Sequence, residues 1–128
     1  MKTLETEHIK TFHTTPVSKP RMVASDKWKK RPCVEKYWAY KDALNSEVGK
    51  FRIPEANFRV VFYLPMSKSW SKKKKASMIN KPHKVRPDCD NLIKAFFDCL
   101  CKEDNFIWDV RVTKLWGDKG QIDIYEEI

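Results

Sequence analysis

The chain has 128 residues, which is room for one domain with one core, spanning residues 1–128, and for no separate regulatory module. Hydrophobic residues make up 41% of the sequence and aromatic residues 12%, so the composition excludes a disordered chain. The net charge of +9 and the pI near 9.4 favour polyanionic partners, namely DNA, RNA or an anionic membrane surface.

A membrane partner has little support in the sequence. The opening MKTLETEHIK carries mixed charges and lacks the apolar core of a signal peptide. The longest apolar run, Val60 to Met66, is far shorter than the roughly 20 residues that a spanning helix requires. We therefore expect a soluble, cytoplasmic protein.

The four cysteines are Cys33, Cys89, Cys99 and Cys101, and no two of them form a CxxC pair. Their spacing, with distant histidines, matches no usual zinc site. We expect four reduced thiols, with Cys99 serving as a small core residue of a helix.

The first half of the chain predicts a strand, a basic excursion and a helix. Residues 8–17 alternate weakly and favour a strand, and the proline-punctuated stretch SKPRMVASDKWKKRP follows as a long loop. Residues 34–48 have apolar side chains at 34, 37, 38, 44 and 48, and Gly49 follows as a helix stop.

The second half predicts a central strand, two helices and a hairpin. Residues 58–65, FRVVFYLP, are β-branched and aromatic and favour a central strand. Ser71 is suited to cap a short basic helix that ends near Asn80. Next comes an amphipathic helix within residues 86–100, whose apolar residues recur on one face: Leu92, Ile93, Phe96, Phe97 and Leu100.

Two alternating runs at the end of the chain, 110–116 and 121–126, are joined by Gly-Asp-Lys-Gly and predict a β-hairpin. The order of elements indicates a single α/β (α+β) domain, in which helices pack on one mixed β-sheet.

The stretch RPDCDN places two aspartates one residue apart at the start of that amphipathic helix. Asp88 is expected at or just before the cap, and Asp90 in the first turn. Lys94, four residues after Asp90, falls on the same polar face, which Asp98 extends. Capping and an ordinary surface ion pair account for this pattern without any chemistry.

A functional interpretation requires a third carboxylate. Asp109 is a candidate, because a strand that begins there and packs beside the helix start would bring it close to Asp88 and Asp90. Crowded carboxylates repel one another unless a cation neutralises them, and hard oxygen ligands select Mg²⁺ or Mn²⁺. Such an ion supports phosphodiester hydrolysis, and Lys94 would stabilise negative charge on the phosphate.

Nine basic residues and no acidic one lie between Glu55 and Asp88, which favours contact with DNA over a merely solvated helix face. The expected DNA-binding residues are Lys72, Lys73, Lys74, Lys75, Lys84 and Arg86, with Lys19 and Arg21 as further phosphate contacts. For Trp70, burial under the short helix is favoured over stacking on a base. His83 is expected to be a phosphate neighbour or a surface residue.

RPDCDNLIKAFFDCL, followed by IWDVRVTKLW, resembles the RusA family of Holliday junction resolvases, which phages and prophages commonly encode. KPRM with RPCVEKYWAYKDAL is similar to the family's amino-terminal half, and FYLPMSKSWSKKKKASMINKPHKVRPDCDN resembles its central segment. The resemblance extends over residues 8–126, nearly the whole chain.

The resemblance implies a RusA-like fold and a Mg²⁺-dependent homodimer that cuts four-way DNA junctions symmetrically in recombination and repair, in the cytoplasm of a bacterial host. It implies that Asp88, Asp90 and Asp109 bind the metal and that Lys94 is the catalytic lysine. Many members carry two consecutive acids where this chain has Trp108 and Asp109. Glu103 or Asp104 is therefore the alternative third acid.

Two classes of function remain open. The first is the metal-dependent, structure-selective endonuclease. The second is a non-catalytic nucleic-acid-binding protein whose aspartates only cap a helix. A DNA-binding regulator is disfavoured, because no helix-turn-helix pattern is evident.

Overall fold

The computed structural model describes residues 6–21 and 31–127 of the chain. In these ranges the elements are β1 (Thr6–Phe12), α1 (Pro32–Val48), β2 (Phe58–Pro65), α2 (Lys72–Met78), α3 (Cys89–Leu100), β3 (Val110–Gly117) and β4 (Gln121–Glu127). This is the order of elements predicted from the sequence.

The strands form one mixed sheet in the order β1-β4-β2-β3. β2 pairs in parallel with β3 from Phe58↔Val110 to Pro65↔Gly117, and antiparallel with β4 on its other edge. β1 pairs antiparallel with β4. The prediction of a single α+β domain with a mixed sheet is confirmed.

The predicted hairpin between the last two strands is wrong. β3 and β4 are not neighbours, because β2 lies between them. β2 is the most apolar strand, and its interior position leaves none of its backbone groups at a free edge. Residues 118–120 therefore cross the end of β2. The crossing is close, because a Cβ on Gly117 would lie 2.9 Å from the Cβ of Tyr63 on β2 and one on Gly120 would overlap Thr15.

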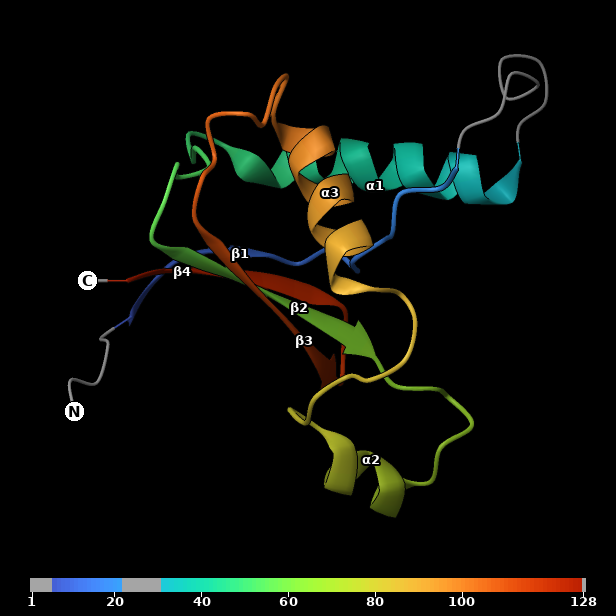
Figure 1. Ribbon diagram of the computed structural model, residues 1–128. Helices are drawn as coiled ribbons and strands as arrows, with labels where there is room; N and C mark the ends of the chain where they lie inside the picture. Colours follow the sequence, from blue (N-terminus) through green and yellow to red (C-terminus); the bar gives the residue numbers. More distant parts are fainter. Residues whose placement is uncertain (1–5, 22–30, 128) are drawn as a thin grey trace.

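Helices α1 and α3 cover one face of the sheet, whereas α2 lies apart, beyond the carboxyl ends of β2 and β3 (Figure 1). α1 ends where predicted, since Gly49 has the positive φ of 56° that favours glycine. Its buried side chains are Val34, Tyr37, Tyr40 and Leu44. The apolar position expected at Trp38 is instead 48% exposed.

The core is built around the ring of Phe96 on α3. This ring meets Phe12 of β1 edge-on at a centroid distance of 5.5 Å and Phe62 of β2 at 5.9 Å. All three side chains are fully buried. Edge-to-face aromatic packing adds to the free energy gained by burial. One helix residue thus joins two strands.

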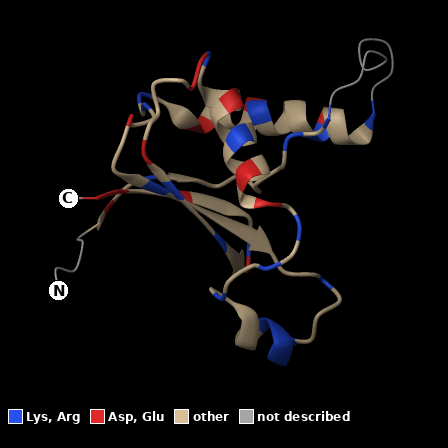
Figure 2. Cartoon of the chain, in the orientation of Figure 1, with Lys and Arg blue, Asp and Glu red and all other residues tan. Residues whose placement is uncertain are grey.

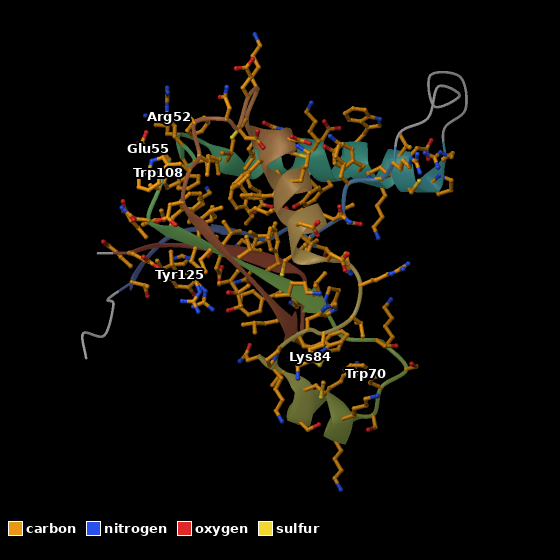
Figure 3. All side chains as sticks on the ribbon, in the orientation of Figure 1. Arg52, Glu55, Trp70, Lys84, Trp108 and Tyr125 are labelled. Carbon is orange, nitrogen blue, oxygen red and sulfur yellow. The ribbon has the colours of Figure 1, made fainter. Side chains whose placement is uncertain are left out.

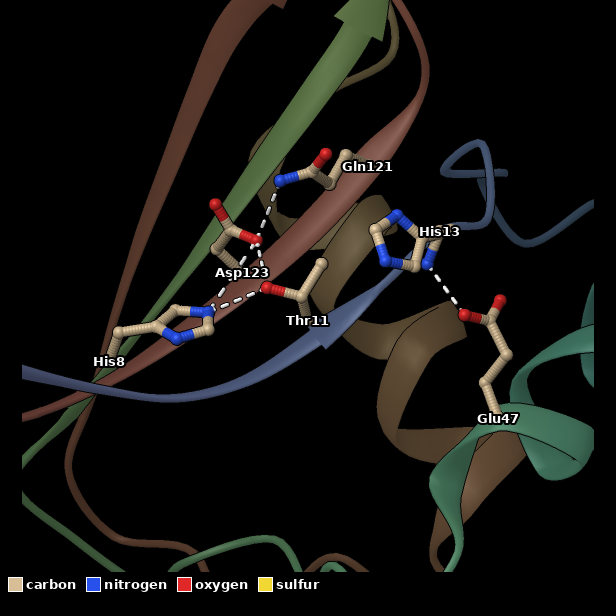
Figure 4. Close-up of polar contacts among 6 residues, drawn as sticks. All are labelled: His8, Thr11, His13, Glu47, Gln121 and Asp123. Atoms are coloured by element: carbon tan, nitrogen blue, oxygen red, sulfur yellow. Dashed lines mark hydrogen bonds and ion pairs between the residues drawn. The ribbon is translucent and has the colours of Figure 1, made fainter.

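The first strand is shorter than predicted, because the chain leaves the sheet after Phe12. The carboxylate of Glu47 on α1 accepts a hydrogen bond from the backbone N–H of His13 at 2.7 Å (Figure 4). It also accepts one from the hydroxyl of Thr14. Residues 13–17 are thereby directed away from β4 and along the helical layer.

Asp123 on β4 is buried yet fully supplied with partners. Its Oδ1 accepts hydrogen bonds from the hydroxyl of Thr11 at 2.8 Å and from the amide of Gln121 at 2.9 Å, and His8 lies 3.9 Å away (Figure 4). These bonds offset the cost of burying the carboxylate and fasten β1 to β4.

All four cysteines are free thiols. Cys99 is buried in the core, as predicted, and burial raises the pKa of its thiol. Among the described residues, no helix has the length and apolar character that crossing a bilayer requires.

We expect Phe96→Ala to lower the free energy of unfolding by about 3–5 kcal/mol, because it leaves a cavity between two strands and removes both ring contacts. Phe106→Ala is the matched control, since that ring is 43% exposed, and it should cost no more than about 0.5 kcal/mol. Denaturation in urea measures both changes. Equal losses in the two variants would contradict this account of the core.

Candidate active site and nucleic-acid interface

The segment before α3 extends the edge of the sheet beside β3. The N–H of Asn80 donates to the carbonyl of Trp116 at 2.8 Å, and the N–H of Trp116 donates to the carbonyl of Lys81 at 2.9 Å. The N–H of His83 donates to the carbonyl of Lys114 at 3.1 Å. Residues 80–83 therefore continue the hydrogen bonding of the sheet and fix the path of the chain between α2 and α3.

Lys114 fixes the last turn before α3. Its ammonium donates to the carbonyl of Val85 at 2.7 Å and to that of Pro87 at 2.8 Å. Pro87 immediately precedes Asp88, so one β3 side chain sets the position at which α3 begins.

Asp88 and Asp90 lie where the sequence predicted, at the N-cap and in the first turn of α3. Asp88 caps through its backbone, because its carbonyl accepts from the N–H of Leu92 at 3.0 Å, whereas its side chain makes no capping hydrogen bond. Asp90 accepts only a local bond from the N–H of Asn91, at 3.0 Å. Both residues are exposed. Simple side-chain capping does not account for Asp88.

Lys94 is exposed on the same helix, and its ion pair is with Asp98 at 3.8 Å. Lys19 also reaches Asp98, at 2.6 Å. The ion-pair partner of Lys94 is thus the acid one turn after it, and not Asp90, which the sequence suggested. On a helix, an acid four residues before a lysine is the more favourable order, because it agrees with the helix dipole.

Asp109 lies at the opposite end of α3 from Asp88 and Asp90. Its carboxylate is 3.3 Å from the N–H of Asn57, just before β2 begins. α3 has 12 residues and spans about 18 Å. Figure 3 shows Trp108, the neighbour of Asp109 in sequence, beside Arg52 and Glu55. It lies far from Trp70 and from Lys84, which is in the loop before α3.

The expectation that one chain brings Asp109 to the start of α3 is therefore wrong. Among residues 6–21 and 31–127, no three His, Cys, Asp or Glu side chains are grouped to hold a metal ion. Glu103 and Asp104 lie in the connection that follows the carboxyl end of α3, so neither alternative acid lies at the helix start. The three proposed ligands do not form a metal site within one chain.

The basic residues before Asp88 follow α2 and the loop to α3 (Figure 2). We call residues 68–86 the basic arm. Lys75 is half-buried, and the exposed members are Lys68, Lys72, Lys73, Lys74, Lys81, Lys84 and Arg86. α2 is capped by Ser71, whose hydroxyl accepts from the N–H of Lys74 at 3.1 Å, and it buries none of its residues. Its lysines are therefore free to face a partner. Arg21 is exposed as well, and Lys19 is the residue paired with Asp98.

A stack of rings joins α2 to the start of α3. Lys74 lies over the ring of Trp70 at 4.2 Å, Trp70 lies 4.9 Å from Trp116, and Trp116 lies 4.1 Å from His83. Trp70 packs against a strand residue, as its expected burial implied, although it remains half-buried. Because α2 buries none of its residues in the core, this stack is its packing contact with the rest of the described structure.

The expectation that His83 is a surface residue is wrong, because only 6% of it is exposed. Burial, and then the positive charge of Lys114, lowers its pKa below the ordinary value. Both effects favour the neutral form of the ring. The HKV context contains no apolar periodicity that would have revealed this burial, which arises from pairing with β3.

The fold and the site define a basic α+β domain with the features of a nucleic-acid enzyme, because the basic arm leads to two exposed carboxylates. The sequence model of the family described as endodeoxyribonuclease RusA matches residues 13–125 of the chain. The chain belongs to the RusA family of endodeoxyribonucleases, as its motifs predicted. No curated protein matches it.

We expect the pKa of His83, followed by NMR, to lie below about 6.5. Lys114→Met removes the nearby positive charge and should raise this pKa, whereas Lys119→Met, an exposed control in the connection between β3 and β4, should not.

Because the folded pKa is below that of the unfolded chain, the neutral ring contributes fully to stability above a pH of about 6.5. That contribution is lost as the pH falls from there through the folded pKa. A wild-type midpoint at or above the ordinary value would contradict the assignment of His83 as a buried, neutral ring.

Proposed function

We propose that the protein is a Mg²⁺-dependent endodeoxyribonuclease that resolves four-way DNA junctions by paired, symmetric cleavage in recombination and repair. The observation that carries the proposal is the pair of exposed carboxylates, Asp88 and Asp90, at the end of the basic arm. Membership of the RusA family supports the nuclease activity and a branched DNA substrate.

Asp88 and Asp90 are suited to part of a metal site. Both are exposed and neither carboxylate is committed to a long-range ion pair, so their oxygens are free to bind a hard cation such as Mg²⁺ or Mn²⁺. When bound, such an ion activates water and stabilises the leaving oxygen of a phosphodiester. Two carboxylates at a helix start are also favoured by the helix dipole without any metal, so the third ligand decides between the alternatives.

We assign the third ligand, Asp109, to a second copy of the chain. Within one chain the parallel pairing of β2 and β3 keeps Asp109 at the far end of α3. A two-fold dimer that brings the start of α3 against the partner's Asp109 would complete two equivalent sites. Two such sites fit one cut in each of two strands.

Lys94 is proposed to stabilise negative charge on the phosphate that is cut. It lies one turn after Asp90 on the exposed face of α3. Its ion pair with Asp98 is long and on the surface, and such pairs contribute little. Lys94 can therefore exchange Asp98 for a phosphate oxygen at small cost.

The residues proposed to hold DNA are Lys72, Lys73, Lys74, Lys75, Lys84, Arg86, Lys19 and Arg21. α2 presents the first four without burying any of its residues. Contacts from flexible ammonium groups to phosphates position the DNA without reading its sequence. Selectivity for branched DNA must then come from other parts of the surface.

The second candidate is a non-catalytic nucleic-acid-binding protein. The separation of Asp109 from Asp88 and Asp90 within one chain, among the residues that the structure describes, is the observation that favours it. The same experiment tests both functions.

We expect Asp88→Asn and Asp109→Asn each to abolish cleavage of a synthetic four-way junction in Mg²⁺ while leaving junction binding intact. Co-purified mixed dimers of these two variants should regain nicking, because one of their two sites combines an intact Asp88 with an intact Asp109. Gel analysis of cleavage products with differently tagged chains measures this.

Mixed dimers of Asp88→Asn and Asp90→Asn are the control and should stay inactive, since each site then lacks one of these acids. If each variant alone is inactive and the mixed dimers of Asp88→Asn and Asp109→Asn regain no nicking, the third ligand does not come from the partner. If both single variants cut at the normal rate, these aspartates are not metal ligands. If the wild type binds junctions and never cuts them in Mg²⁺, the protein is the non-catalytic binder.

The lysine run of α2 should set the salt dependence of DNA binding. Replacing Lys72, Lys73, Lys74 and Lys75 together by Ala should lower the slope of log affinity against log salt by up to about 0.9 for each phosphate that is no longer neutralised. The control is Lys50→Ala with Lys102→Ala, two exposed lysines outside the basic arm, which should leave the slope unchanged. An unchanged slope in the α2 variant would show a merely solvated helix face.

A further inference from the structure

A cavity of about 930 Å³ lies beside the start of α3. Its wall is formed by residues 15–18 and Pro20, by the carboxyl end of β2 and by the loop that leads to Asp88. The volume is in the range of pockets that bind small organic molecules. The roles proposed for the basic arm and for the two carboxylates do not require such a cavity.

The lining combines flat rings, apolar walls and scattered hydrogen-bonding groups. Trp116 and His83 supply the rings, and Thr15, Ser67 and Asn91 supply polar side chains. The apolar part comes from Pro16, Val17, Pro20, Leu64, Pro65, Val85 and Pro87. A planar, partly polar heteroaromatic ring suits such a lining better than an alkyl chain or a sugar.

In this lining, the ring of His83 has a buried nitrogen that lacks a hydrogen-bond partner. Its Nδ1 is buried and makes no hydrogen bond with the described residues. A buried polar atom without a partner costs free energy, which a ligand regains when it supplies that partner. The Nδ1 of a neutral imidazole donates or accepts according to the tautomer, and the edge of a nucleobase presents both kinds of partner.

The position of the cavity relates it to DNA. Asp88 and Arg86 belong to the lining, and Lys36 adds a second positive charge. The cavity thus reaches one proposed metal ligand, Asp88, and the last basic residue before it, Arg86. A nucleotide whose phosphate lies at Asp88 would have its base within reach of the opening.

We propose that this cavity takes up one unstacked nucleobase of the strand that is cut. The inference rests on the proposed nuclease function and adds the means by which the enzyme selects branched DNA. A base inside a duplex is stacked and paired, and taking it out costs free energy. That cost is smallest where stacking is already interrupted, as at a branch point, so a pocket that requires a free base favours junctions over linear duplex.

The test uses junctions in which an abasic site replaces each nucleotide near the mapped cut, one at a time. Binding is measured in EDTA, so the readout does not depend on cleavage. The wild-type protein should lose affinity about 5- to 100-fold at one position, the range that base–aromatic stacking supplies, and little at its neighbours.

Ser67→Trp fills the cavity from an exposed position and should bind intact and abasic junctions alike. Ser46→Trp, at an exposed site on α1 outside the cavity, is the matched control and should keep the wild-type discrimination. His83→Leu keeps an apolar side chain against Trp116 and should remove differences in affinity among the four bases at the sensitive position.

If the wild type cuts junctions but no abasic position weakens binding, or if Ser67→Trp discriminates as the wild type does, the base-binding proposal is overturned while the nuclease assignment stands. If the wild type binds junctions and never cuts them in Mg²⁺, the nuclease assignment fails instead.

Discussion

The parallel pairing of β2 with β3 is the constraint on which the rest of the structure depends. Two parallel strands begin at the same end of a sheet, so the chain that leaves β2 must travel back before β3 can start. α3 makes that return along the covered face, and its start and end lie at opposite ends of the strands (Figure 1). The distance between Asp88 and Asp109 follows directly from this topology.

The same pairing leaves the outer edge of β3 open, and the loop before α3 uses it. Residues 80–83 hydrogen-bond to that edge, and Lys114 holds the carbonyls of Val85 and Pro87. A lysine in a sheet would ordinarily serve solubility, but here its ammonium group binds carbonyl oxygens. The acidic helix start is thus positioned by a strand, through the part of the basic segment that directly precedes it.

Local patterns predicted most of the elements, and the long-range arrangement escaped them. The apolar face of α3, the Ser71 cap and the Gly49 stop are encoded within a few residues of each element. The hairpin prediction failed because alternation and a Gly-containing turn do not say whether a third strand lies between. For the same reason Asp109 was placed wrongly, and the burial of His83 depends on a partner strand much later in the chain, at Lys114.

Helix α2 buries no residue, and just before it the ring of Trp70 stacks on that of Trp116. The free energy of folding resides almost entirely in the sheet and in the helices that cover it. Substitutions in α2 are consequently expected to change the free energy of folding little, so its length and charge can vary with the DNA proposed as its partner. The DNA contacts proposed for α2 and the fold can therefore evolve at different rates.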